Sequence, residues 1–89
     1  MKAIVSVVGK DQMGIIASVC STLHEQNINV LDISQTILQE YFVMIMLTDV
    51  SACSLPFSDL STLLCESGKL KGLDIRIQRE DIFNAMHRI

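Results

Sequence analysis

The chain has 89 residues, mean hydropathy +0.41 and a net charge of −3, which gives room for one domain and argues against a nucleic-acid-binding surface. Hydrophobic residues make up 49% of it and aromatic residues only 4%, so we expect an aliphatic core. No apolar run reaches the roughly 20 residues that span a bilayer, and three cysteines without a C-x-x-C pair fit neither a disulfide framework nor a zinc site. We therefore expect one cytoplasmic domain over residues 1–89, with no metal, no cofactor and no membrane contact.

The first half of the chain predicts a strand, a helix and then a hairpin. Residues 2–8 are apolar or β-branched on both faces, as in a strand inside a sheet. Residues 15–27 follow a helical period, and residues 29–39 alternate with many polar positions, which is typical of an edge strand. After the short Gln39-Glu40 connection, residues 41–47 are again apolar on both faces. The apolar stripe of the predicted helix consists of Ile15, Ile16, Val19, Cys20 and Leu23.

The second half predicts a loop over residues 48–54, a second helix and a last strand. Pro56 suits the first turn of this helix, and Ser67 and Gly68 are expected to weaken its last turn. Its predicted apolar stripe consists of Phe57, Leu60, Leu63, Leu64 and Leu70. The last strand is predicted from the alternation of Leu73, Ile75 and Ile77 with polar residues. A final turn or short helix is predicted over residues 81–87.

This order of elements predicts the ferredoxin-like βαββαβ fold, an α+β arrangement with two helices on one face of a four-stranded antiparallel sheet. In that topology the first and third strands are central and the other two are edges, which agrees with their patterns. The helices cover one face only, so the apolar second face of the central strands needs another cover. A second copy of the chain is the simplest cover, and a domain this small gains stability from association. We therefore expect a homodimer.

The first loop and the segment after the first helix carry a resemblance to a known family. Residues 7–16 are VVGKDQMGII, and the predicted helix is followed at residues 27–35 by NINVLDISQ. This pattern resembles the ACT domain family over essentially the whole chain. It is similar to the short stand-alone ACT-domain proteins of the UPF0237 type and to the amino-terminal half of the glycine cleavage system repressor. Met13 stands where the family loop usually has Pro.

The resemblance implies a regulatory domain that binds an amino acid or another small molecule at a dimer interface and performs no catalysis. The residues implied as ligand-binding are Asp11, Gln12, Met13, Gly14, Ile15 and Asn29. Backbone N–H groups at the start of the first helix suit a ligand carboxylate, and Gly14 allows close approach because it lacks a Cβ. Asp11 would accept hydrogen bonds from a ligand ammonium group. Asn29 would donate and accept hydrogen bonds from the same subunit or from its mate.

Asp11, Gly14 and Asn29 also have ordinary structural explanations. Asp11 can cap the first helix, and Gly14 can serve the turn before it. Asn27 and Asn29 both suit a helix-to-strand turn, because Asn tolerates left-handed backbone angles. Two hypotheses therefore stay open. One is a ligand-binding domain that regulates a partner enzyme or regulator in trans, and the other is a protein–protein interaction module with a vestigial ligand site.

An enzyme is the third and least favoured hypothesis. Neither His24 nor His87 has a partner at a spacing that suggests acid–base chemistry or metal binding. The sequence contains no G-x-S-x-G and no H-E-x-x-H motif. A small acylphosphatase-like enzyme would need an Arg-containing phosphate loop after the first strand, and that loop carries Lys10 instead.

Overall fold

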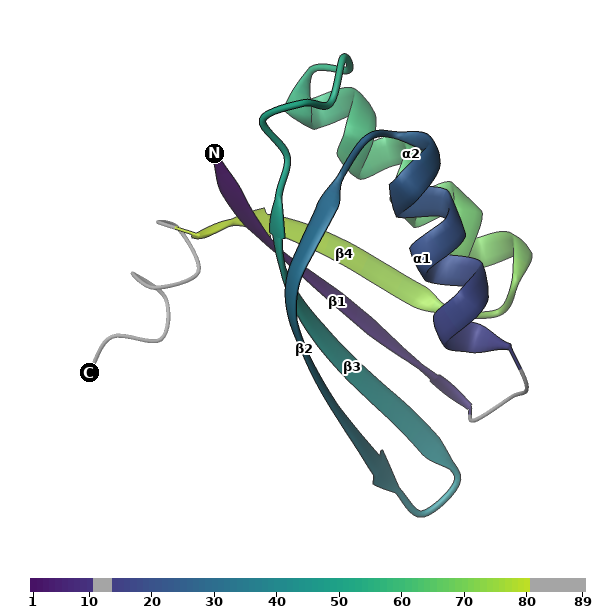
Figure 1. The fold of residues 1–89 in the computed structure, drawn as a ribbon. Helices are drawn as coiled ribbons and strands as arrows, with labels where there is room; N and C mark the ends of the chain where they lie inside the picture. The colour runs from purple at the N-terminus through teal and green to yellow at the C-terminus, as the bar shows by residue number, and fades with distance from the viewer. Residues whose placement is uncertain (11–13, 81–89) are drawn as a thin grey trace.

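The computed structural model describes residues 1–10 and 14–80, which form the expected βαββαβ unit (Figure 1). The strands are β1 (Lys2–Lys10), β2 (Asn29–Leu38), β3 (Tyr41–Asp49) and β4 (Asp74–Arg79), and the helices are α1 (Ile15–Glu25) and α2 (Phe57–Leu70). The strands form one antiparallel sheet in the order β2-β3-β1-β4. The ferredoxin-like fold is therefore confirmed, while the turn or helix predicted over residues 81–87 lies outside the described residues.

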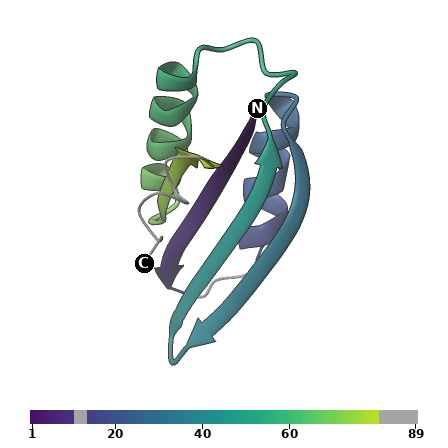
Figure 2. The same cartoon turned by 90° about the vertical axis from the view of Figure 1, so that its left-hand side faces the viewer.

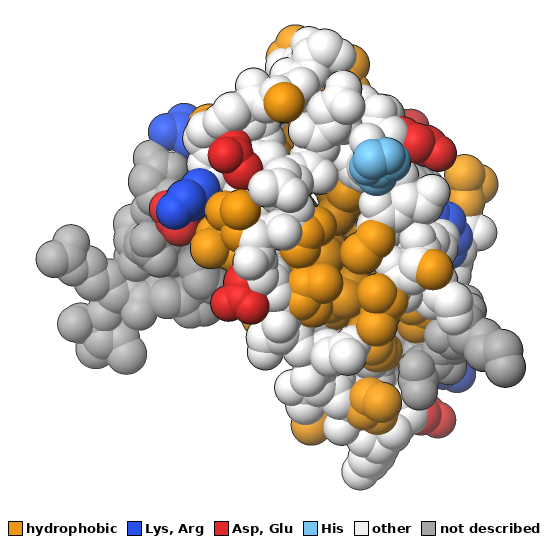
Figure 3. Space-filling model, in the orientation of Figure 1, with side chains coloured by type: hydrophobic (Ala, Val, Ile, Leu, Met, Phe, Trp, Pro, Cys, Tyr) orange, Lys and Arg blue, Asp and Glu red, His pale blue; other side chains and the backbone are white. Residues whose placement is uncertain are grey.

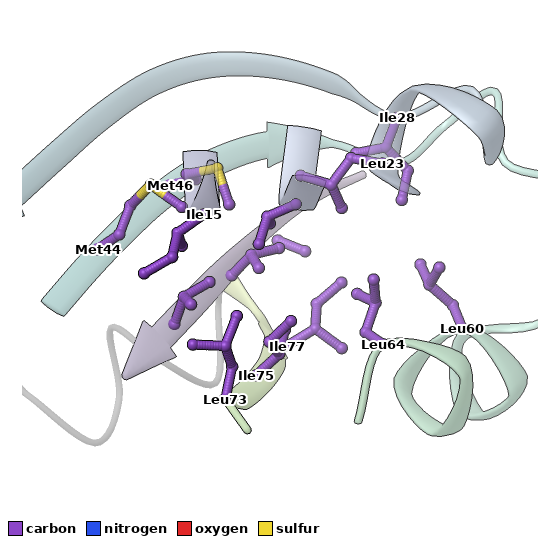
Figure 4. Packing of buried hydrophobic residues seen from close by; sticks show 14 of the residues in the cluster. Ile15, Leu23, Ile28, Met44, Met46, Leu60, Leu64, Leu73, Ile75 and Ile77 are labelled. Atoms are coloured by element: carbon purple, nitrogen blue, oxygen red, sulfur yellow. The ribbon is translucent and has the colours of Figure 1, made fainter. Parts of the chain in front are cut away.

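Both helices pack against the same face of the sheet, as two views at right angles show (Figures 1 and 2). Aliphatic side chains from the two layers fill the space between them (Figure 4). The sheet contributes Ala3, Val5, Val7, Met44, Met46, Ile75 and Ile77, and the helices contribute Ile15, Val19, Leu23, Leu60 and Leu64. The aliphatic core expected from the composition is confirmed.

The sheet face opposite the helices, here called the open face, is apolar along its centre. Val8 of β1 and Ile45 of β3 are each 41% exposed on it, and Ile4 and Val43 are half-buried. The prediction that the central strands are buried on both faces is therefore correct for the helix side only. In the described part of the chain, the helices lie on one side of the sheet, and this leaves the open face accessible.

The central strands run two residues further than the sequence predicts. Thr48, assigned from the sequence to a loop, is fully buried in β3 because its hydroxyl donates a 2.9 Å hydrogen bond to the carbonyl oxygen of Ala3. Gly9, expected to interrupt β1, continues the strand where a larger residue would not fit. A Cβ at Gly9 would lie 2.6 Å from Leu73 Cδ2 and 3.4 Å from the carbonyl oxygen of Gly72.

Helix α2 buries a different stripe from the one predicted. Leu60 and Leu64 point into the core as expected, but the next position on that face is Gly68, and Leu70 is 90% exposed. Gly68 brings the helix close to β4, because the Leu73 N–H donates a 2.8 Å hydrogen bond to the Gly68 carbonyl oxygen. This glycine therefore serves close packing between helix and strand, and α2 remains helical to Leu70.

Candidate functional site

The start of α1 is an open helix terminus. Gly14 occupies the N-cap position with φ 78° and ψ 10°, a left-handed conformation that glycine adopts without the steric cost a Cβ imposes. No side chain of the described residues hydrogen-bonds to this cap. Within residues 1–10 and 14–80, a Cβ placed on Gly14 would meet no atom within 4 Å. A ligand can therefore approach the backbone closely at this point.

The backbone N–H groups of the first turn are hydrogen-bond donors at the start of α1. The N–H of Ser18 donates to the carbonyl oxygen of Gly14 at 2.9 Å, which starts the helical ladder. The N–H groups of Ile15, Ile16 and Ala17 precede that bond and have no partner within the helix. They lie at the positive end of the helix dipole, so the site favours an anionic group such as a carboxylate.

Two of the predicted site residues, Gly14 and Ile15, come together at this terminus. The Ile15 side chain is 5% exposed and belongs to the core, so its contribution to a ligand site is its backbone N–H. The buried side chain anchors the first turn against the sheet. The predictions for Asp11, Gln12 and Met13 fall outside the described residues.

Asn29 does not lie near Gly14 within one subunit. Asn29 is in register with Asp49, which pairs with Lys2 at the beginning of β1. The loop to α1 leaves from Lys10, at the other end of that strand. Eight residue steps at about 3.3 Å separate the two ends by about 26 Å. The structure therefore places Asn29, which is exposed, and the helix start at opposite ends of the sheet.

Asp49, the register neighbour of Asn29, is held in its ionised form. The Ser51 hydroxyl and the Ser51 backbone N–H, the latter 2.9 Å from Asp49 Oδ1, together lower the pKa of this carboxyl group. The N-terminal ammonium group also lies 3.7 Å from the same oxygen. Asp49 thus stabilises the turn after β3, and we do not add it to the candidate ligand residues.

An apolar groove between α1 and β2, here called the edge groove, was not predicted. Ile16 of α1 is 39% exposed, and Ile33 and Ile37 of β2 are 42% and 58% exposed. The register places both β2 residues on the helix side of the sheet, opposite the buried Met46 and Phe42. Figure 3 shows hydrophobic side chains gathered between these two elements. The alternation of β2 indicated an apolar face but not that the helices leave it uncovered.

Metal-ligand clusters and membrane-spanning helices are both absent from the part of the chain that the structure describes. Residues 1–10 and 14–80 contain no group of three or more His, Cys, Asp or Glu side chains that could hold a metal ion. No described helix combines the length and the apolar character needed to cross a bilayer. The three cysteines, Cys20, Cys53 and Cys65, are unpaired thiols in partly buried positions.

Comparisons with known proteins agree with this geometry. A family model described as an ACT domain matches residues 2–78. A UPF0237 protein of Clostridium acetobutylicum is 58% identical over 89 residues, which is 100% of both chains. The solved ACT domain protein from Streptococcus pneumoniae is 41% identical, with a TM-score of 0.84 over 98% of each chain.

A more distant likeness extends the fold comparison. A solved structure described as a candidate glycine cleavage system transcriptional repressor has a TM-score of 0.72 at 20% identity, over 86% of this chain and 44% of that one. At this identity the likeness concerns the fold alone. The matched family model and the full-length relatives settle the assignment, and the chain belongs to the ACT domain family.

Proposed function

We propose that this chain is a regulatory domain that binds an amino acid, forms a homodimer and acts in trans on a partner enzyme or regulator. The observation that carries the proposal is the start of α1 at Gly14, where N–H groups without helical partners meet no capping side chain among residues 1–10 and 14–80. Membership of the ACT domain family supports it, since domains of this family are typically regulatory and bind ligands.

The proposed binding mode uses the two charges of an amino acid. The ligand carboxylate would accept hydrogen bonds from the first-turn N–H groups, with Gly14 leaving room for its oxygens. The ligand ammonium group would donate to the Asp11 carboxylate, and Gln12 and Met13 would form the rest of the loop around the ligand. Ile15 would keep the helix start in place through its buried side chain.

A thermal-shift screen against the proteinogenic amino acids tests the proposed ligand class. A bound amino acid at 100 times its dissociation constant is expected to stabilise the fold by about 2.7 kcal/mol. The matched control is the amide of the same amino acid, which lacks the carboxylate and should give little or no shift. A flat response to all amino acids would favour the alternative function, an interaction module with a vestigial ligand site.

The homodimer is proposed to form along β2. All residues from Leu31 to Leu38 are exposed, and an edge strand presents backbone N–H and carbonyl groups that a second strand can pair with. Antiparallel pairing of two β2 strands about a two-fold axis would extend the sheet across both subunits. It would also bring apolar side chains of the second copy over the edge groove formed by Ile16, Ile33 and Ile37.

This pairing would bring Asn29 of one subunit to the end of the sheet where the first loop of the other subunit begins. A symmetric pairing centred on β2 puts Asn29 of one copy beside Leu38 of the other. Leu38 is in register with Tyr41, which pairs with Lys10 where β1 leads into the loop. The second subunit would therefore supply an Asn29 at the end of the sheet where β1 leads into the loop. Within its own subunit, Asn29 lies at the opposite end.

Substitution of Ile37 tests the proposed β2 interface. Ile37→Lys is expected to weaken dimerisation at least tenfold, about 1.4 kcal/mol, because it puts a charge on an apolar groove beside the pairing edge. The measurement is sedimentation velocity over a concentration series, with circular dichroism to check folding.

Ile45→Lys is the matched control, since Ile45 is an exposed strand isoleucine on the open face. It also tests the sequence-based expectation that a second copy covers that face. If Ile45→Lys dissociates the dimer and Ile37→Lys does not, the subunits associate face to face and the β2 interface is wrong.

A further inference from the structure

A shallow groove of about 570 Å³ runs along one side of α2. Here called the α2 groove, it is lined by Leu55 and by six residues of the helix between Asp59 and Leu70. It is distinct from the start of α1 and from the edge groove, because it shares no lining residue with either. The proposed ligand site and the proposed dimer do not use it.

Two rows of side chains give the α2 groove its character. Leu63 and Leu70 are seven residues apart, and so are Asp59 and Glu66, so each pair spans two turns on one side of the helix. The lining residues include these two acids and no Lys or Arg. Lys71 reaches one end, where its ammonium group donates to the Ser67 hydroxyl at 3.4 Å. Four residues separate each acid from the next leucine, so the two rows lie only about 40° apart around the helix and acids and leucines alternate along one face.

The fold uses Leu63 of the apolar row, which packs partly buried against the core, but not Leu70. The core face of α2 is formed by Leu60, Leu64 and Gly68, which leaves Leu63 partly buried and Leu70 90% exposed. A single exposed leucine is ordinary on a protein surface. Here the exposed leucine continues a hollow that contains two further leucines and is bordered by carboxylates, which is the composition of a docking site.

We propose that the α2 groove docks an amphipathic helix of another protein, with apolar residues toward Leu63 and Leu70 and Lys or Arg toward Asp59 and Glu66. A helix laid along a groove places residues i, i+3 or i+4, and i+7 on one side, which matches the seven-residue spacing of both rows. Basic side chains on the incoming helix would complement the acids and fix its orientation. This docking does not depend on amino-acid binding at α1.

Neither described helix of a second copy of this chain is a good occupant of the α2 groove. Helix α1 contains no Lys or Arg, and α2 contains only Lys69, so neither can present two basic residues over two turns. A membrane surface is also poorly matched, because Asp59 and Glu66 would face anionic headgroups. The charge pattern therefore points to a basic helix from a different protein.

Selection from a displayed library of helical peptides tests this inference. Peptides of about 14 residues, roughly 21 Å long, cover the length of α2. Binders selected on the wild-type protein are expected to carry Leu or Ile at helical spacing together with Lys or Arg. The best peptide is then labelled, and its affinity is measured by fluorescence anisotropy at two salt concentrations.

Two substitutions in the groove and one outside it make the result specific. Leu70→Gln and Glu66→Lys alter exposed side chains and are each expected to weaken peptide binding at least tenfold, with Glu66→Lys also reducing the salt dependence. Glu25→Lys on α1 is the matched charge control and should leave the affinity unchanged.

The inference is overturned if no peptide is selected, if the selected peptides lack basic residues, or if Leu70→Gln and Glu66→Lys bind them as well as the wild type does. A peptide displaced by Ile37→Lys alone would occupy the edge groove and would overturn it too. The amino-acid thermal shift of Leu70→Gln should equal that of the wild type. Failure of the ligand proposal and failure of the docking proposal are therefore seen in separate assays.

Discussion

Replacing Gly68 by Ala is expected to destabilise the domain by about 2–3 kcal/mol, although Ala is the better helix former. A Cβ at this position would lie 2.7 Å from the carbonyl oxygen of Leu73 and 2.9 Å from Ile75 Cγ1. The carbonyl oxygen is backbone, and the Leu73 N–H is itself bonded to Gly68, so the contact cannot be relieved by turning a side chain. Helix and strand would have to move apart, which opens the core beside Leu64.

Urea unfolding measures this effect, and Lys69→Ala is the matched control. Lys69 neighbours Gly68 in the same turn but is exposed, so its substitution should change the free energy of unfolding by less than about 0.5 kcal/mol. Gly68→Val should cost more than Gly68→Ala because it adds volume at the same contact. If Gly68→Ala were as stable as the wild type, the close approach of α2 and β4 would not exist in solution.

The order of elements was predictable because hydrophobic period and strand composition agree along the whole chain. The ends of the central strands were not, because they depend on partners far away in sequence. Thr48 has the composition of a loop residue, yet it lies in β3 because its hydroxyl bonds to Ala3. Gly9 likewise lies in β1 because the turn before β4 packs against it. No local pattern contains those contacts.

Which leucines of α2 face the core was also not predictable, because it depends on the contact between α2 and β4. Leu63 and Leu70 sit on the flank of the helix, where a helical wheel admits them to either the core or the surface. The close approach at Gly68 settles the rotation of the helix and turns Leu70 outward. The sequence predicts that Gly68 weakens the last turn of the helix. In the structure, Gly68 makes the close contact with β4 that determines which side of α2 faces the core.

The sequence predicted that Gly14 lies at the start of a helix, but it did not predict that Asn29 lies at the opposite end of the sheet. The loop pattern identified Gly14 at the start of a helix, and the left-handed angle there explains why glycine occupies the position. The separation of Asn29 from Gly14 follows from topology, because a strand-helix-strand unit returns the chain to the end of the sheet where it began. Asn27, one of the two asparagines that suit a helix-to-strand turn, takes the left-handed conformation with φ 59°.

Gly14→Ala is expected to separate ligand binding from folding when it is compared with Gly72→Ala. Both glycines have left-handed backbone angles, φ 78° and φ 72°, and neither would bring a Cβ within 4 Å of another atom in the described part of the chain. Each substitution should therefore lower the free energy of unfolding by a similar amount, about 1–2 kcal/mol, through backbone strain alone.

Only Gly14→Ala would place a methyl group where the ligand carboxylate is proposed to lie. It should weaken amino-acid binding at least tenfold, about 1.4 kcal/mol, while Gly72→Ala retains the wild-type affinity. Calorimetric titration of both variants with the amino acid found in the screen makes the comparison. Equal affinities of the two variants would mean that the ligand does not bind at the start of α1. Loss of affinity in Gly14→Ala alone would show that the open helix start is the binding surface.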